Sequence, residues 1–410
     1  MTRRFRASAP PPSRRRFRSL VLGPWSLVLI LFLAGCTAFR RELPRPGRTV
    51  LDSPLVIVPA TTLSNYLVVE TKWDKHGPYH FLIDTGASVT LVTPALATRY
   101  GATNAPPATT PLVRVRSETG ETALLTSTTL TRLEVGGARF ENVAAVIYDC
   151  ASLSAHLGIK IDGILGFPLF RETLLTLDYP QSRILLQPRN AGPLLPGSAL
   201  TFNNDRHTPI VPLQLGGDAI VALIDSGSDA GLSLNPAGLA PVYAVPPKVG
   251  VAVATLSGDR EQRVGRLAAT LHIGDYAVEQ PVVDLTDQLT SLGGRLLKDF
   301  TVTFDQDHNR VTFYRESRLP IAPAPRRSVG LGFDKAPAYW RVVNVVPDSP
   351  AAAAGVQPGD LITRIEGEPV SQWNIGRYQQ LVKTAGEITF TFLNGTQESD
   401  KTLKVFDLVP

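Results

Sequence analysis

The sequence predicts a mainly β protein in which two homologous β lobes precede a smaller unit of strands and helices. From Leu51 to about Arg318, short runs that alternate apolar and polar residues are separated by Gly, Asn, Asp and Pro. This pattern is typical of strands joined by turns. The 34 prolines and 33 glycines also fit many short strands better than long helices. The same stretch repeats itself internally, which indicates two lobes of one kind.

The repeat is visible at three places along the chain, in the same order. Residues 81–88 (FLIDTGAS) recur 141 positions later as residues 222–229 (ALIDSGSD). Two shorter segments follow: 133–136 (LEVG) recurs as 271–274 (LHIG), and 177–180 (LDYP) with Arg183 recurs 127 positions later as 304–307 (FDQD) with Arg310. The smaller offset means that the second copy is shorter than the first, although its segments occur in the same order. We therefore expect lobes at about residues 51–192 and 198–318.

Length, composition and charge fit an ordinary globular protein. A chain of 410 residues allows two to four compact units, and 43% apolar with 19% charged residues allows a sizeable core. The net charge of +5 comes from residues 1–35, which hold seven arginines and no acidic residue. Without them the formal charge falls by seven, to −2. The rest of the chain therefore carries no basic stripe of the kind that binds nucleic acid.

Residues 1–36 have the pattern of an export signal. A basic region, Arg3 to Arg18, precedes an apolar run from Leu20 to Ala34, which is short for a membrane-spanning helix. The run ends in Leu-Ala-Gly-Cys at residues 33–36, which resembles the lipobox of bacterial lipoproteins. The resemblance implies that Cys36 is acylated and anchors the protein outside the cytoplasm. The alternative is an uncleaved signal anchor, and residues 13–17 (SRRRF) also resemble a twin-arginine export signal.

Residues 37–50 contain two prolines and a glycine among charges, and are expected to form a tether between the lipid and the fold. If Cys36 is acylated, Cys150 is the one cysteine left, and no disulfide within the chain is possible. Cys150 follows the apolar stretch Val143–Tyr148, so we expect it to be a buried small apolar residue. It has no accompanying Cys-His pattern that would indicate a nucleophile.

The two copies of Asp-(Thr/Ser)-Gly are the strongest sign of chemistry. Each follows two large apolar residues, so Asp84 and Asp225 each stand at the end of a buried strand, on a glycine turn. A pseudo-twofold repeat can bring both carboxylates to one axis. Two carboxylates at about 3 Å share a proton, so that the ionised member accepts a proton from water while the protonated member polarises a carbonyl.

Asp84-Thr85-Gly86-Ala87 and Asp225-Ser226-Gly227-Ser228 resemble the active-site turns of aspartic peptidases, and the first is closest to the bacterial retropepsin-like branch. The resemblance covers about residues 51–318 and implies a bilobal aspartic-protease β fold. It implies that Asp84 and Asp225 are catalytic and that Thr85 and Ser226 tie the turns together. It also implies that apolar-apolar-Gly segments pack behind them, at residues 164–166 (ILG) and 291–293 (SLG).

Three departures from the family pattern are visible. Ser291 replaces an apolar residue, and Asp229 would add a like charge near the pair. The family's β-hairpin flap would turn around residues 117–121 in lobe one and 257–259 in lobe two, yet residues 105–130 contain no Tyr or Trp. The flap tyrosine of pepsin-like enzymes is therefore missing, which favours the retropepsin-like type.

Other chemistry has weaker support. His76 and His80 are separated by Gly-Pro, which excludes a helical zinc pair and predicts a hairpin before Asp84. Ser226 and Ser228 have no marked basic partner, so a serine nucleophile is less well supported than the carboxylate pair. The chain has no glycine-rich phosphate loop. We expect neither a metal nor another cofactor.

After a proline-rich linker at residues 319–328, a third unit is expected at residues 329–408. It has strands at 340–346, 361–365 and 387–393, and helices at about 349–355 and 377–383. Together with Gly330-Leu331-Gly332-Phe333, this order closely resembles a PDZ domain of bacterial proteases. The resemblance implies that this loop binds a peptide carboxylate. Ile375 would open the groove helix and favour an apolar residue two positions before the peptide C-terminus.

The sequence therefore predicts an aspartic endopeptidase that acts on proteins or peptides and is lipid-anchored at an extracytoplasmic face of a bacterial membrane. We expect an active monomer because both lobes lie in one chain, and we expect the PDZ-like unit to bind C-terminal peptides or partners. One alternative is a lipid-anchored scaffold whose lobes bind peptides without cleaving them. Another is a serine protease with a PDZ domain.

Overall fold

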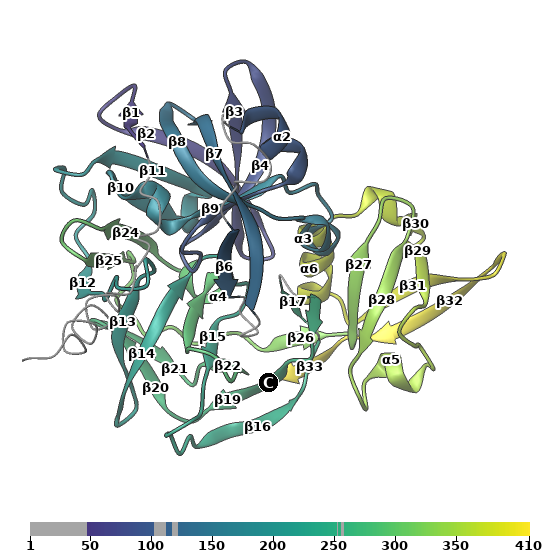
Figure 1. Ribbon diagram of the computed structural model, residues 1–410. Coiled ribbons are helices and arrows are strands. Elements are labelled where there is room, and N and C mark those ends of the chain that lie inside the picture. Colours follow the sequence, from purple (N-terminus) through teal and green to yellow (C-terminus); the bar gives the residue numbers. More distant parts are fainter. Residues whose placement is uncertain (1–46, 102–111, 117–121, 252, 256–257) are drawn as a thin grey trace, which may run out of the picture. The chain divides into compact units, whose positions relative to one another are not determined.

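The computed structural model describes residues 47–101, 112–116, 122–251, 253–255 and 258–410. The predicted signal segment with Cys36, the tether as far as residue 46 and the first flap tip at 117–121 lie outside this part. The described residues are mainly strands (Figure 1). Within them, no helix has both the length and the apolar character needed to cross a membrane.

The first lobe contains most of a 14-stranded sheet and two short helices. Its outer strands run in the order β2-β3-β4-β9-β5-β8-β7-β6, with β1 paired to β8. The elements are β1 (Thr49–Leu51), β2 (Val56–Leu63), β3 (Tyr66–Trp73), β4 (His76–Asp84), β5 (Thr90–Val92), α2 (Pro94–Tyr100), β6 (Leu112–Arg116), β7 (Thr122–Val135), β8 (Ala138–Ile147), α3 (Ala151–Leu157) and β9 (Gly163–Gly166).

The two lobes share the other end of this sheet, in the order β12-β25-β24-β10-β11-β2. The shared part consists of β10 (Thr173–Asp178), β11 (Arg183–Pro188), β12 (Ser198–Thr201), β24 (Thr301–Asp305) and β25 (Arg310–Tyr314), with 3-10 turns η2 (Phe167–Phe170) and η3 (Tyr179–Gln181). Thr176 on β10 faces Thr303 on β24, and their hydroxyl oxygens are 2.9 Å apart. These positions are 127 residues apart, the offset of the repeat, so a pseudo-twofold axis passes between them.

The second lobe has its own nine-stranded sheet in the order β16-β19-β22-β15-β23-β14-β13-β20-β21. Its elements are β13 (Ile210–Leu215), β14 (Asp218–Asp225), β15 (Leu232–Leu234), β16 (Tyr243–Val249), β19 (Arg263–Leu267), β20 (Thr270–Ile273), β21 (Tyr276–Glu279), β22 (Val282–Leu285), β23 (Ser291–Gly293) and α4 (Gly294–Leu297). The strands β17 (Val253–Thr255) and β18 (Gly258–Arg260) form a separate hairpin.

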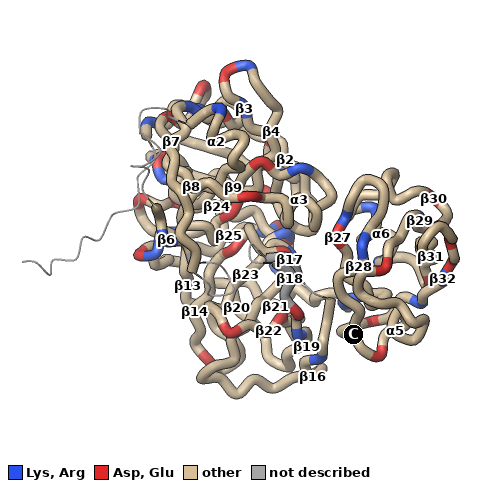
Figure 2. The backbone as a smooth tube through the Cα atoms, turned by 45° about the vertical axis from the view of Figure 1, so that its right-hand side comes forward, with Lys and Arg blue, Asp and Glu red and all other residues tan. Residues whose placement is uncertain are grey.

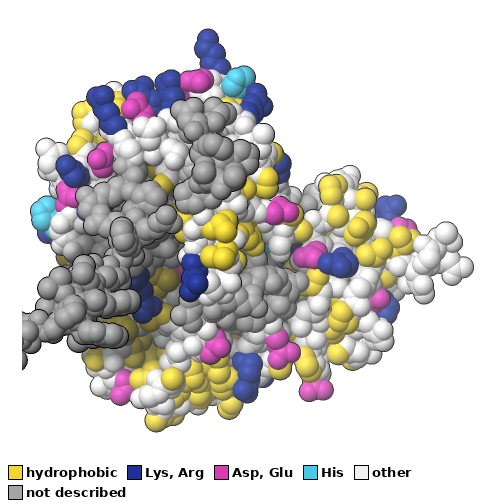
Figure 3. All heavy atoms as spheres, viewed as in Figure 1, with side chains coloured by type: hydrophobic (Ala, Val, Ile, Leu, Met, Phe, Trp, Pro, Cys, Tyr) yellow, Lys and Arg dark blue, Asp and Glu magenta, His cyan; other side chains and the backbone are white. Residues whose placement is uncertain are grey.

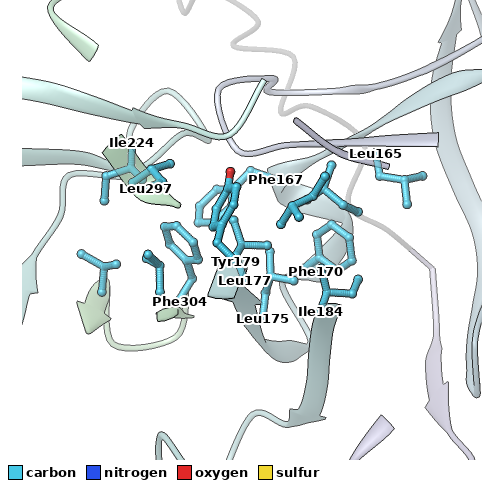
Figure 4. Close-up of a cluster of buried hydrophobic side chains, with 14 of the residues drawn as sticks. Leu165, Phe167, Phe170, Leu175, Leu177, Tyr179, Ile184, Ile224, Leu297 and Phe304 are labelled. Carbon is cyan, nitrogen blue, oxygen red and sulfur yellow. The ribbon is translucent and has the colours of Figure 1, made fainter. Parts of the chain in front are cut away.

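One hydrophobic core runs through both lobes beneath the ends of the central strands. Figure 4 shows Phe167 and Tyr179 of the first lobe side by side, with Phe304 and Ile224 of the second lobe beside them. All four side chains are almost fully buried. Burial of apolar surface on this scale is the main stabilising contribution to such a fold, and it joins the lobes into one unit.

The repeated Leu-x-x-Gly segments have a backbone reason for their glycines. Gly136 turns from β7 into β8 with φ +56°, and Gly274 turns from β20 into β21 with φ +57°. A side chain is strained in this left-handed region, whereas glycine is not. The repeat therefore keeps the residue that the hairpin turn requires.

The C-terminal unit is a six-stranded sheet with two helices and a small two-stranded sheet. Its elements are β26 (Arg326–Ser328), β27 (Leu331–Lys335), β28 (Trp340–Val345), α5 (Pro350–Ala353), β29 (Leu361–Ile365), β30 (Glu368–Pro369), η4 (Val370–Gln372), α6 (Ile375–Thr384), β31 (Glu387–Asn394), β32 (Gln397–Lys404) and β33 (Phe406–Val409). Helix α5 is shorter than expected, because Ser349 caps it and Gly355 follows at φ +69°.

Two predicted connections differ from the structure. The tether was expected to extend to residue 50, but β1 begins at Thr49 and pairs with β8. The proline-rich stretch 319–328 was expected to be a linker, but Ile321 is buried against β21 and forms backbone hydrogen bonds with Ala277 and Glu279. Arg326 forms an ion pair with the buried Asp284 of β22. Apolar and charged contacts thus fix a segment whose composition alone indicates an extended tether.

Candidate active site

Asp84 and Asp225 stand at the ends of equivalent strands. β4 pairs in parallel with β9, which sets Asp84 opposite Gly166. In the second lobe, β14 pairs in parallel with β23, which sets Asp225 opposite Gly293. The apolar-apolar-Gly segments therefore lie behind the two turns in matching register, with Ser291 buried in the position of Ile164.

Backbone amides hold one oxygen of each carboxylate. The amides of Gly86 and Ala87 donate to Asp84 Oδ1 at 2.8 and 3.0 Å. In the second turn, Gly227 N donates to Asp225 Oδ1 at 2.9 Å. Amide donors favour the ionised form of a carboxylate, so each turn supports a negative charge on its aspartate.

The two turns cross so that each glycine lies against the other lobe's carboxylate. A Cβ on Gly86 would lie 2.5 Å from Asp225 Oδ1, and a Cβ on Gly227 would lie 2.2 Å from Asp84 Cγ. No side chain other than hydrogen fits at either position. The glycines are therefore required for the approach of the two lobes as well as for the turns themselves, and the approach brings both carboxylates to one place.

Four hydrogen bonds made by the hydroxyls of Thr85 and Ser226 connect the two turns. The hydroxyl of Thr85 donates to the carbonyl of Ile224 at 2.7 Å and accepts from Ser226 N at 3.0 Å. The hydroxyl of Ser226 donates to the carbonyl of Ile83 at 2.9 Å and accepts from Thr85 N at 3.0 Å. Both side chains are fully buried. This reciprocal arrangement fixes the separation of the two aspartates.

The electrostatic environment favours protonation of one member of the pair. Burial raises the pKa of Asp84 above 3.8, while the amides of Gly86 and Ala87 and the Asp225 side chain act in the opposite direction. Asp225 is also buried. Since two adjacent buried carboxylates resist double ionisation, the site can hold one proton between them.

Tyr179 is a site residue that the sequence interpretation missed. Its side chain is fully buried, and its hydroxyl has no hydrogen-bond partner among the described residues. Burial raises its pKa, and the charges of Asp225 and Asp84 raise it further. The repeated Leu-Asp-Tyr-Pro segment was the available signal, because it places this residue beside the axis after β10.

Asp229 has neighbours that the sequence did not indicate. Its backbone carbonyl accepts from Asn65 Nδ2 at 3.2 Å and lies 3.4 Å from Arg295 Nε. Burial lowers the pKa of Arg295, and the charge of Asp229 opposes that shift. Asp229 thus lies near buried positive charge, including Arg326. The sequence interpretation gave it only as a like charge near the pair, because these arginines are distant along the chain.

Two hairpins correspond to the predicted flaps. β6 and β7 pair from Leu112 with Thr126 to Arg116 with Thr122, on either side of the undescribed tip. Leu112 and Leu124 are more than half exposed on this hairpin. Figure 3 shows hydrophobic side chains near the middle of this face, where Figure 1 places β6. In the second lobe, Thr255 pairs with Gly258, and the predicted Ser257 lies outside the described residues.

The remaining candidates lie elsewhere. His76 begins β4, and the amide of His80 donates to Asp162 Oδ2. Cys150 is buried and free of disulfides, as predicted for a buried small apolar residue, and burial raises the pKa of its thiol to about 12. Ser228 Oγ accepts from Ala230 N at 3.3 Å. Among the described residues, no group of three or more His, Cys, Asp and Glu could hold a metal ion.

The PDZ-like loop has the expected order. Gly330 has φ +92°, its amide donates to Ser328 Oγ, and its carbonyl accepts from Val346 N. Leu331, Gly332 and Phe333 then begin the edge strand β27. Ile375 is the first residue of α6, the position predicted to open the groove helix, and its side chain is buried.

Comparison with known families agrees with both assignments. Residues 69–169 match the family model described as aspartyl protease, and residues 341–393 match that of a PDZ domain. The first match includes Asp84 but not Asp225, and the second begins after the Gly330–Phe333 loop. A search of curated proteins found no match. The chain is thus mainly β and is similar to retropepsin-like aspartyl proteases in its first lobe and to PDZ domains in its C-terminal unit.

Proposed function

We propose that this protein is an aspartic endopeptidase whose two lobes contribute Asp84 and Asp225 to one catalytic site. The crossing of the two turns carries the proposal, because it sets the glycine of each turn against the carboxylate of the other. The reciprocal hydrogen bonds of Thr85 and Ser226 support it further, since they hold the carboxylates in a fixed relation.

The reaction uses the single proton that the pair retains. The ionised carboxylate accepts a proton from a water molecule, whose oxygen attacks the peptide carbonyl carbon. The protonated carboxylate donates its proton to the carbonyl oxygen, which gives a neutral tetrahedral diol. A proton then passes to the peptide nitrogen, the carbon–nitrogen bond breaks, and the pair returns to one proton. No covalent bond to the protein forms at any step.

Inhibitor classes distinguish this proposal from a serine protease. Soluble protein lacking residues 1–46 is incubated with a denatured protein mixture, and new termini are detected by mass spectrometry. We expect a statine-containing peptide to abolish cleavage, because its hydroxyl occupies the place of the attacking water. A serine-directed acylating reagent and a chelator should leave cleavage unchanged. Loss of cleavage with the serine reagent alone would contradict the carboxylate mechanism.

The pH optimum provides a second test. Burial raises the pKa of Asp84, so this carboxyl retains its proton to higher pH than an exposed aspartate. Ala87 also lacks the hydroxyl that could donate to the ionised carboxylate. We expect activity to peak above about pH 4. The substitution Ala87→Ser should move the optimum down by roughly half to one pH unit. A wild-type peak below pH 4, or no shift on substitution, would contradict this assignment.

The N-terminal segment supports a place outside the cytoplasm. The basic and apolar runs before Cys36 favour export and acylation, so we propose a lipid-anchored protein at an extracytoplasmic membrane face. Metabolic labelling with a palmitate analogue should mark the wild type and not Cys36→Ser.

We also propose that one chain forms the complete site, because both aspartates lie in one compact unit, residues 44–410.

A further inference from the structure

The C-terminal unit contains the two elements, a strand and a helix, that form the sides of the peptide groove in PDZ domains. An extended peptide adds to the free edge of a strand and lies against a helix. β27 is the edge strand of the six-stranded sheet, paired on one side with β28. α6 supplies the helix, and Ile375, Gln379 and Val382 lie on one of its faces, four and then three residues apart.

The strand side of this groove is covered by the first lobe. Both views of the backbone place α3 next to β27 (Figures 1 and 2). Lys335 on β27 donates from Nζ to the carbonyl of His156 in the last turn of α3. A Cβ on Gly158, just after α3, would lie 3.4 Å from Lys335 Cδ. The edge that a peptide strand would occupy is therefore in contact with α3.

The helix side and the carboxylate loop are covered as well. Gln379 on the groove face of α6 donates from Nε2 to Ser64 Oγ at 3.1 Å, in the turn between β2 and β3. A Cβ on Gly332 would lie 3.0 Å from Val251 Cγ1, just before β17. Segments of both lobes thus contact the loop and the helix that would hold a peptide.

The burial of the groove side chains agrees with these contacts. Leu331, Phe333, Ile375 and Val382 are each less than one-tenth exposed. They belong to one buried cluster that also contains Leu157 of α3 and other first-lobe residues. Phe333 also packs inside the C-terminal unit, against Trp340 and Tyr378. The contacts that Lys335, Gln379 and Gly332 make with the lobes therefore carry the inference that the chain itself lies along the groove.

The covering helix is also connected to the candidate active site. Ser154 Oγ in α3 accepts from Ile161 N at 2.9 Å, and β9, which supports Asp84, begins two residues later. At its other end, His156 lies between charges of both units: burial and Lys335 lower its pKa, and Asp229 opposes this shift. A movement of α3 would therefore change the support of the Asp84 turn through Ile161 and β9.

We propose that α3 and its neighbouring turns occupy the PDZ-like groove as an internal ligand, and that the free C-terminus of an apolar peptide displaces them and activates cleavage. The occupancy rests on the contacts of Lys335 and Gln379 with the first lobe. The activation rests additionally on the proposed peptidase function. The ligand is a chain end with a free carboxylate and apolar final residues, because the groove combines a glycine loop with apolar walls.

Binding and backbone exchange test the occupancy without any need for cleavage. The probe is a fluorescent ten-residue peptide ending in Val-Phe-Val with a free carboxylate, and the same peptide with a C-terminal amide is its control. The Asp225→Asn protein is used so that the probe stays intact. We expect the free acid to bind at least ten-fold more tightly than the amide. Its binding should speed hydrogen exchange at Ser154 and Gly158, whose amides donate within and just after α3.

A pair of substitutions separates displacement from simple binding. Lys335→Met with Gln379→Ala removes two contacts to the first lobe and should tighten peptide binding about ten-fold, because less of the groove is occupied. Lys401→Met is the matched control, since its Nζ donates to the carbonyl of Ala354 within the C-terminal unit. It should leave peptide affinity unchanged. Melting curves of all variants establish that each one is folded.

Cleavage by the otherwise unchanged protein completes the test. The free-acid peptide should raise kcat/KM several-fold, the amide should not, and the Lys335→Met, Gln379→Ala protein should be active without peptide. Absence of binding, or binding with unchanged exchange in α3 and equal affinity in all variants, would overturn the occupancy. Faster exchange without increased cleavage would overturn the activation alone. If the peptide binds and speeds exchange as expected but no cleavage is detected with or without it, the peptidase function itself would be contradicted.

Discussion

Replacing Asp84 with Asn is expected to abolish cleavage while making the protein more stable at neutral pH. A positioned acid or base contributes about 10²–10⁴-fold to catalysis, and the amide can neither accept the proton from water nor supply one. We therefore expect a loss of at least about 1,000-fold in kcat/KM. The measurement compares cleavage rates and thermal unfolding of the two proteins at pH 7.

The gain in stability follows from the direction of the pKa shift. Burial raises the pKa of Asp84 in the folded protein above its value of 3.8. Between these two pKa values the folded state binds more protons than the unfolded state, so stability falls as pH rises through this interval. At neutral pH the wild type is therefore less stable than it would be with Asp84 protonated. Asp84→Asn removes this destabilisation because the amide does not ionise. The advantage of the variant should therefore shrink as the pH falls from the folded-state pKa of Asp84 toward 3.8, and it should be absent at lower pH.

Asp218→Asn is the matched control, because Asp218 is an exposed aspartate at the start of β14, the strand that ends at Asp225. Its substitution should change neither cleavage nor the melting temperature appreciably. An Asp84→Asn protein that melts at a lower temperature than the wild type at pH 7 would contradict the assigned electrostatics. Retained cleavage would contradict the catalytic role.

Removing the hydroxyl of Thr85 is expected to have the second largest effect. Thr85→Val keeps the shape of the side chain but leaves the amide of Ser226 and the carbonyl of Ile224 without their hydroxyl partner in a fully buried place. An unsatisfied buried group costs about 1–3 kcal/mol. We expect about 2–4 kcal/mol of lost unfolding free energy, measured by urea denaturation, together with a large loss of cleavage.

Ser226→Ala should act through the same contacts, because the Ser226 hydroxyl donates to the carbonyl of Ile83 and accepts from the amide of Thr85. The double variant should lose less unfolding free energy than the sum of the losses in the two single variants, since each substitution already breaks the shared arrangement. Thr85→Ser keeps the hydroxyl and should recover most of the stability and activity. Strictly additive effects would show that the two residues stabilise the turns independently.

The repeat was sufficient to predict the symmetric parts of the structure. It indicated equivalent strands before Asp84 and Asp225. The family resemblance, together with the 127-residue offset of the repeat, located the supporting segments at residues 164–166 and 291–293, and the sheet register matches them. The third repeated segment lies at the pseudo-twofold axis through Thr176 and Thr303. These features follow from local sequence, because an apolar strand followed by Asp-(Thr/Ser)-Gly specifies both the strand and the turn that ends it.

Contacts between distant segments could not be predicted in this way. Arg295 and Arg326 lie 66 and 97 residues beyond Asp229 along the chain, and a lone arginine is usually a solvated surface residue. The contact of Lys335 with α3 depends on how a PDZ-like sheet packs against a lobe, and local pattern carries no information about it. The same reason applies to residues 319–328, whose prolines fit a tether but whose Ile321 and Arg326 are fixed by packing.

The most direct measurement of the central claim concerns Asp225, since the aspartyl protease match ends at residue 169 and covers the first lobe alone. Wild type, Asp84→Asn, Asp225→Asn and an equal mixture of the two variants are incubated with a denatured protein mixture from pH 3 to 8. New termini are then counted by mass spectrometry. If one chain forms the site, both variants and their mixture are inactive. Cleavage by Asp225→Asn would instead show that two first lobes pair between chains, and would contradict the account.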